Sequence, residues 1–168
     1  MDKWVCTKCG EKEIPQDTEY CEGCEEKSFK KIGGWLYLPA IGLIVMILSS
    51  ITGIVTTINE IFPFYSQLTD RWKCFITFAF ILDLLIFLLI IVTTIFFFRK
   101  SKKTPYLFIS LLILNITVQG IMIFLTINVM SAPVEPNYTL NLIRSILHAA
   151  VWIPYFIVSV RVKKTFVN

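Results

Sequence analysis

Four long apolar runs constrain this chain more than any other feature of its sequence. They cover residues 36–58, 74–98, 105–129 and 141–160, and each reaches the ~20 residues that a helix needs to cross a bilayer. Of the 168 residues, 55% are hydrophobic and only 17% are charged, which is more apolar side chain than a soluble domain of this size could bury. The chain is therefore predicted to be an integral membrane protein.

The runs predict an all-α membrane protein, built as a bundle of four transmembrane helices. Lipid offers no hydrogen-bond partner to free backbone N–H and C=O groups, so a spanning segment must be a helix or a barrel strand. The runs lack the alternation of apolar and polar residues that barrel strands show, which leaves the helix. Because the composition changes abruptly near residue 32, we expect two domains, a polar module over 1–31 and a transmembrane domain over 32–168.

Basic residues are unevenly distributed over the predicted span ends. One side carries Arg71 and Lys73. The other side carries Lys30, Lys31, Arg99, Lys100, Lys102, Lys103, Arg161, Lys163 and Lys164. Because lysine and arginine resist translocation, this asymmetry predicts that both termini and the loop at 99–104 lie in the cytoplasm. The net charge of +4 is therefore explained by topology and not by an affinity for nucleic acid.

Four of the five cysteines form two Cys-x-x-Cys pairs near the N-terminus, Cys6 with Cys9 and Cys21 with Cys24. Four thiolates at this spacing can surround one tetrahedral metal ion and leave no position for a catalytic water. The pattern predicts a small zinc ribbon with one structural zinc ion, although iron also suits four thiolates. Two disulfides, or two redox-active pairs, are the alternatives. A reducing cytoplasm and the absence of a βαβ pattern disfavour both.

The ribbon carries two local expectations. Gly10 and Gly23 lie in the two cysteine turns, where glycine tolerates a positive φ. The segment 11–20, with Pro15 and Asp17 at its middle, is expected to form a short hairpin. This N-terminal module contains six lysines and eight acidic residues, so it has no electrostatic drive to bind nucleic acid.

Polar residues within or beside the spans form a second candidate cluster. Its members are Glu60, Asp83, Asn115, Gln119, Arg144 and His148. Asp83 and His148 are expected roughly 10–14 Å below the outer surface, and Arg144 near the level of Glu60. A charge in lipid without a partner is costly, so we expect all four charged side chains to face the bundle interior, where each acid can meet a base. Such pairs either fix helix register or relay protons or ions.

Small residues on the first span indicate a packing face. Ser49 and Gly53 are four residues apart and therefore lie on the same side of a helix. Small side chains at this spacing let two transmembrane helices approach closely. A homodimer through this face and a monomer packed on itself both fit the pattern.

Two stretches carry a resemblance to a known family. Residues 32–43 read Ile-Gly-Gly-Trp-Leu-Tyr-Leu-Pro-Ala-Ile-Gly-Leu, and residues 152–166 contain Trp-x-Pro-Tyr-Phe-x-x-Ser-x-Arg-Val-Lys. Over about residues 32–166 the chain resembles the YdgK-like family of bacterial four-span inner-membrane proteins of unknown function. The resemblance implies a bacterial plasma membrane and no established activity. The ribbon lies outside the family core and is expected to be an accessory module.

These patterns favour a non-enzymatic membrane protein. No nucleophile with an adjacent base is visible, and the single histidine leaves acid–base chemistry without its usual parts. We expect the ribbon to serve as a docking or regulatory module for an unidentified protein partner, anchored in the lipid bilayer by the bundle. The alternative is a small transporter or channel that uses Asp83 with His148 and Glu60 with Arg144.

Overall fold

The computed structural model describes residues 4–15, 18–24 and 34–167. The transmembrane part consists of helices in the order η1 (Gly34–Leu36), α2 (Tyr37–Thr56), η2 (Thr57–Ile61), η3 (Phe62–Gln67), α3 (Asp70–Phe98), α4 (Thr104–Asn128), α5 (Pro136–Val158) and α6 (Val160–Thr165). Four helical segments, starting at Gly34, Asp70, Thr104 and Pro136, are long and apolar enough to cross a membrane. The predicted all-α fold with four transmembrane helices is confirmed.

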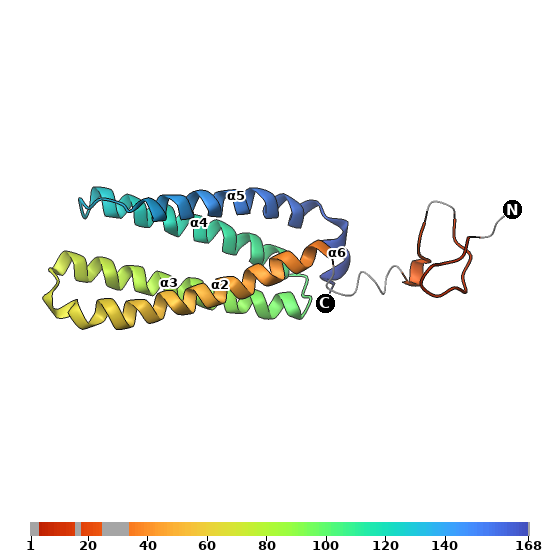
Figure 1. The fold of residues 1–168 in the computed structure, drawn as a ribbon, viewed down its shortest axis with the longest axis horizontal. Coiled ribbons are helices and arrows are strands. Elements are labelled where there is room, and N and C mark those ends of the chain that lie inside the picture. Colours follow the sequence, from red (N-terminus) through yellow and green to blue (C-terminus); the bar gives the residue numbers. More distant parts are fainter. Residues whose placement is uncertain (1–3, 16–17, 25–33, 168) are drawn as a thin grey trace.

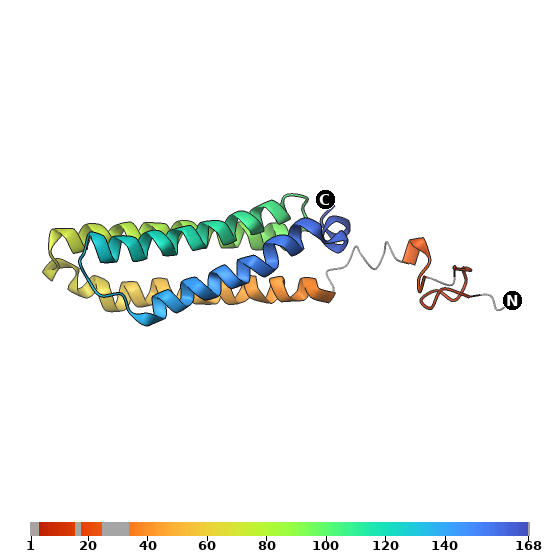
Figure 2. The ribbon, with the colours of Figure 1, turned by 90° about the horizontal axis from the view of Figure 1, so that it is seen from above.

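The long helices form two antiparallel pairs (Figures 1 and 2). One pair, which we call the first arm, is α2 with α3, and the second arm is α4 with α5. The turns within the arms, at 68–69 and 129–135, lie at what we call the hairpin end. The loop at 99–103, which joins the arms, lies with α6 at the opposite end, which we call the basic end.

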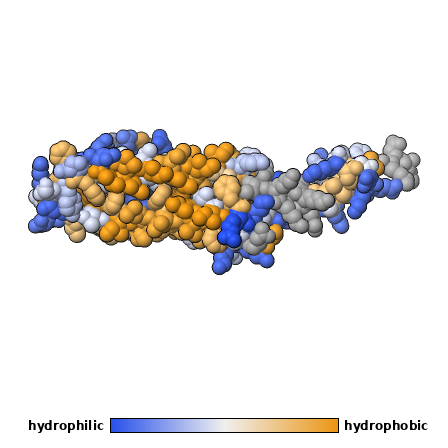
Figure 3. All heavy atoms as spheres, turned by 90° about the horizontal axis from the view of Figure 1, so that it is seen from below, coloured by the Kyte–Doolittle hydropathy of each residue, from blue (hydrophilic) through white to orange (hydrophobic). Residues whose placement is uncertain are grey.

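The face of the bundle seen in Figure 3 is a continuous apolar surface with polar residues at both ends. Between 11% and 22% of the most apolar window of each spanning segment is buried inside the molecule. Large side chains such as Leu48, Leu88, Phe124 and Val151 are more than half exposed. Such a surface is stable only against lipid tails or another apolar surface, so the fold implies contact with a bilayer.

The fully buried core occupies the half of the bundle towards the basic end. In α2 no residue beyond Leu43 is buried, and in α3 none before Ile86. In α4 none beyond Val118 is buried, and in α5 none before Ala149. In the view of Figure 1, the ribbons of the two arms lie nearer to each other beside α6 than at the hairpin end.

Helix α6 seals the basic end of the bundle. Ser159 ends α5 with an extended ψ of 120°, and its hydroxyl accepts a hydrogen bond from the backbone N–H of Val162 at 3.4 Å. The chain then turns back and buries Phe166, whose ring centroid lies 5.2 Å from that of Phe97 and 6.4 Å from that of Phe156. The C-terminal segment is therefore part of the core and holds the two arms together.

The start of the first span packs against the same C-terminal segment. Gly34 has a φ of 58°, in the region where only glycine is unstrained. A Cβ atom at this position would lie 3.1 Å from the nearer guanidinium nitrogen of Arg161. The positive φ therefore favours glycine at position 34, and a side chain there would also displace the end of the Arg161 side chain.

Three spans differ from their predicted limits near the hairpin end, and one of them, α3, begins at Asp70 and not at residue 74. The first span continues past residue 58 through the π turn η2 and the 3-10 helix η3, which ends at Gln67. The fourth begins at Pro136, before the predicted start at 141, because proline fits the first position of a helix. Residues 136–140 contain a single aliphatic side chain, Leu140, so hydropathy alone does not include them.

Candidate metal centre

The four N-terminal cysteines come together in one cluster. The Sγ atoms of Cys6, Cys9, Cys21 and Cys24 all lie within 4.8 Å of one another, and those of Cys9 and Cys21 are 3.9 Å apart. Four sulfur atoms bonded to one ion at ~2.3 Å would lie about 3.8 Å from each other in a tetrahedron. None of the five cysteines of the chain, all of which are described, is in a disulfide. The cluster thus has the donors and the spacing to hold one metal ion.

A tight turn presents the first cysteine pair. An antiparallel bridge between Val5 and Glu13 brackets the turn, and the backbone N–H of Cys6 donates to the carbonyl of Lys12 at 2.9 Å. Gly10 closes it, with a φ of 68° and an N–H that donates to the carbonyl of Cys6 at 2.8 Å. The prediction that Gly10 adopts a positive φ is confirmed.

The turn that carries Cys21 and Cys24 differs from the predicted one. Residues 22–24 form a helical turn, in which the N–H of Cys24 donates to the carbonyl of Cys21 at 2.9 Å. The expected positive φ of Gly23 is therefore wrong, because a helical turn needs none. The antiparallel bridge also starts at Val5, outside the segment 11–20, and the predicted middle of that hairpin at Asp17 lies outside the described residues.

Hydrogen bonds within the cluster prepare two thiols to act as thiolates. The backbone N–H of Cys21 donates to Sγ of Cys6 at 3.3 Å, and backbone N–H groups of this kind lower the pKa of Cys6 to about 6. The N–H groups of Glu11 and Lys12 lower the pKa of Cys9. A hydrogen bond to the side chain of Cys21 instead raises the pKa of Cys24 to about 12. Because metals bind the thiolate, a metal ion entering the cluster must displace the proton of Cys24.

The second candidate cluster divides into two parts. The charged members Glu60, Asp83, Arg144 and His148 are all exposed, so the structure does not enclose them in the bundle interior as expected. Within the described residues, neither Asp83 nor Glu60 pairs with a base. Arg144 lies 3.5 Å from the side-chain oxygen of Asn141, and the ring of His148 lies 6.0 Å from that of Trp152. The physical reason is that the fully buried core ends before it reaches these residues, since it begins only at Ile86 in α3 and at Ala149 in α5.

The amide members of the cluster do meet inside the bundle. The amide nitrogen of Gln119 donates to the side-chain oxygen of Asn115 and, at 2.9 Å, to the hydroxyl of Ser145. This network joins α4 to α5 within the second arm. Ser145 was not among the predicted residues, and its signal is weak because a single serine in a span is common.

The part of the chain that carries the bundle matches a family model over residues 29–167, described as a protein of unknown function. The chain belongs to the DUF2569 family. The match includes all four spanning segments of this DUF2569 protein, whereas the four cysteines lie before its first residue. The narrower YdgK-like name stays a prediction. Neither the curated proteins nor the solved structures give a significant match to the chain.

The fold explains why the two stretches that carry the family resemblance go together. Gly34, in the first stretch, packs on Arg161 in the second. Phe156 and Phe166, both in the second stretch, pack with Phe97 and Phe108 around the basic end. In this DUF2569 protein the two ends of the transmembrane domain thus form one structural unit, which neither stretch indicates alone.

Proposed function

We propose that this protein is a non-enzymatic membrane anchor for a zinc-stabilised docking or regulatory module. The observation that carries the proposal is the compact cluster of four cysteine sulfur atoms, joined in one chain to four membrane-spanning helices. A site with four thiolate ligands has no open coordination position, so its role is structural. So short a segment has too little apolar surface to fold alone, and the metal supplies the missing stability.

Zinc is the proposed ion, because closed tetrahedral sites of four cysteines are typical of structural zinc. The 3.9 Å spacing of the Cys9 and Cys21 sulfur atoms supports such a site. Metal analysis of the purified full-length chain should give one zinc per chain. The Cys21→Ser/Cys24→Ser variant should give no zinc. The Cys74→Ser variant, which removes a cysteine near the start of α3 at the hairpin end, should keep the full zinc content.

We also propose that the module, the C-terminus and the 99–103 loop face the cytoplasm of a bacterial plasma membrane. The basic residues support this orientation, because α6 carries Lys163 and Lys164 back to the end of the bundle where Lys102 and Lys103 lie. A reducing compartment would also keep the cysteines available to a metal. Reporter fusions after residue 168 and within 129–135 should report opposite sides of the membrane.

The docking role is tested by cross-linking in native membranes. Proteins recovered with the intact chain are compared with those recovered with Cys21→Ser/Cys24→Ser at equal expression. Cys74→Ser is the matched control, since it also removes a thiol but leaves the cluster intact. The proposal requires a partner that is kept by the intact chain and by Cys74→Ser and lost from the double variant. Identical recovery from all three would contradict it.

A second candidate function, a small transporter or channel, is favoured by one observation. Asp83 and His148 are exposed at a depth where lipid would strongly disfavour a charge. Water between the arms would solvate them and form part of a polar pathway. This function predicts a flux into proteoliposomes that Asp83→Asn abolishes and that the Cys21→Ser/Cys24→Ser variant retains. The docking function predicts no such flux.

A further inference from the structure

We propose that the two arms close on each other at the hairpin end, so that Asp83 pairs with His148 and Glu60 with Arg144. The structure then represents an open state of a bundle that hinges at its basic end. The inference goes beyond the docking function, because it concerns only the transmembrane helices.

The connections between the arms lie at one end only. The turns at 68–69 and 129–135 each connect helices of the same arm. The 99–103 loop connects the two arms at the basic end, where the hydroxyl of Thr104 donates to the carbonyl of Phe96 at 2.9 Å and Phe166 packs on Phe97. The hairpin ends of the arms are therefore held together by no covalent connection, and the basic end is the natural hinge.

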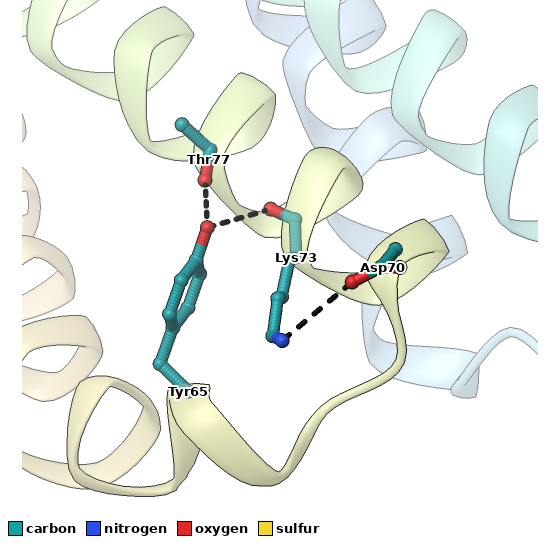
Figure 4. A network of polar contacts seen from close by, with 4 residues as sticks. All are labelled: Tyr65, Asp70, Lys73 and Thr77. Atoms are coloured by element: carbon teal, nitrogen blue, oxygen red, sulfur yellow. Dashed lines mark hydrogen bonds and ion pairs between the residues drawn. The ribbon is translucent and has the colours of Figure 1, made fainter.

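Each arm is braced internally near its hairpin end. In the first arm, the hydroxyl of Tyr65 lies 2.8 Å from that of Thr77, and Lys73 pairs with Asp70 at 3.6 Å (Figure 4). The ring of Phe62 also packs on that of Phe80 at 5.1 Å. The contacts of Tyr65 and Phe62 tie η3 to α3.

The second arm has a brace of its own. Gln119 on α4 bonds to Ser145 on α5 at 2.9 Å. Within the described residues outward of Asp83 and His148, no hydrogen bond, ion pair or ring contact joins this arm to the first. Towards the hairpin end the polar and ring contacts of the described residues thus lie within the arms and not between them.

Asp83 and His148 lie near the buried stripes of their helices. Asp83 precedes Ile86 by three positions and Ile90 by seven, so it lies close to the buried stripe of α3. The ring of His148 lies 6.0 Å from that of Trp152, one turn further inward, and Trp152 packs against the core. Both groups therefore lie at the edge of the core where the arms begin to diverge.

The charges also match in sign and depth. The acids Glu60 and Asp83 belong to the first arm, and the bases Arg144 and His148 belong to the second. Asp83 lies about 20 Å along α3 from its start, and His148 about 18 Å along α5. Glu60 and Arg144 both lie about 12 Å from the hairpin end. Closure would thus bring each acid to a base at its own level and remove both pairs from lipid.

Cross-linking tests the closure in the full-length chain in lipid nanodiscs. Ala79 and Leu142 lie seven residues outward of Ile86 and Ala149, on the core side of each arm, and neither is charged. A short bis-maleimide is reacted with an Ala79→Cys/Leu142→Cys variant, and mass spectrometry of peptides measures the product that joins positions 79 and 142. Because only the product that joins positions 79 and 142 is counted, cross-links of the native cysteines do not contribute to the measured yield.

Closure predicts a product whose yield depends on the charges. Adding Asp83→Asn should lower the yield about threefold or more, the change expected for the loss of one polar pair between membrane helices. The charge exchange Asp83→His/His148→Asp should restore it. Asp70→Asn, which removes an acid paired with Lys73 inside the first arm, should leave it unchanged.

Three results would overturn the proposal. The first is a yield that Asp83→Asn does not change, and the second is a charge exchange that fails to restore it. The third comes from mixing isotopically heavy and light chains before reconstitution. A product that joins heavy to light peptides would place the pairing between two copies of the chain and not between the arms of one.

Discussion

Removing the ring of Phe166 should release α6 from the end of the bundle. The side chain is 4% exposed and packs on the rings of Phe97 and Phe156. Truncating a phenylalanine so buried costs about 3–5 kcal/mol. Helix α6 has six residues and is too short to be stable alone, so most of this loss falls on its docking. A loss of about 3 kcal/mol corresponds to an opening equilibrium roughly a hundredfold larger.

Hydrogen exchange of the backbone amides in α6 measures this opening, because exchange follows the population of the locally open state. In Phe166→Ala these amides should exchange about a hundredfold faster, while the amides of α4 change little. Val167→Ala is the control, since Val167 is 41% exposed and should leave exchange within about twofold. An acceleration below about fivefold would show that the Phe166 ring does not hold α6, and the account of the sealed end would fail.

Three further outcomes are expected. Gly34→Ala should lower the thermal midpoint of the bundle. A φ of 58° costs an alanine about 1–2 kcal/mol, and the Cβ atom of the alanine would press on Arg161. An unchanged midpoint would contradict the close approach. Metal affinity should fall as the pH falls, because protons compete with the metal ion for the thiolates. A metal-sensitive dye should report weaker binding with decreasing pH, most steeply below about 6, where Cys6 is protonated as well, and pH-independent retention would rule out thiolate ligation. Ser145→Ala should destabilise the α4–α5 pair by about 0.6–1.7 kcal/mol in a membrane unfolding assay. A stabilised variant would show that the hydrogen bond from Gln119 to the Ser145 hydroxyl does not stabilise the pair.

The parts of the fold that depend on length and spacing could be predicted from the sequence. An apolar run of ~20 residues has few alternatives to a spanning helix, and two Cys-x-x-Cys pairs bring four sulfur atoms into reach of one ion almost irrespective of the residues between them. Gly10 could be placed because it follows a cysteine turn directly. Gly23 could not, because a helical turn and a glycine turn both fit two residues between cysteines.

Contacts between distant segments were beyond the sequence. The C-terminal run from Arg161 to Phe166 is basic and lies beside the membrane, so its charge alone indicates a lipid contact. The structure instead buries Val162 and Phe166 and uses the segment to close the core. The decisive feature is Ser159, whose extended backbone turns the chain back, and a serine before a short polar segment does not specify that turn.

The intramembrane charges show where periodicity stops being informative. In a soluble helix the apolar stripe faces the core, but in a membrane the lipid and the core are both apolar, so the face of Asp83 or His148 does not follow from the pattern around it. The depth of each charge in the membrane depends only on its position along the helix, so it could be predicted from the sequence. The observed exposure follows from the chain connections, which hold the arms together only at the basic end. If the arms close, the expected pairing of Asp83 with His148 is a property of the closed state and their exposure a property of the open one.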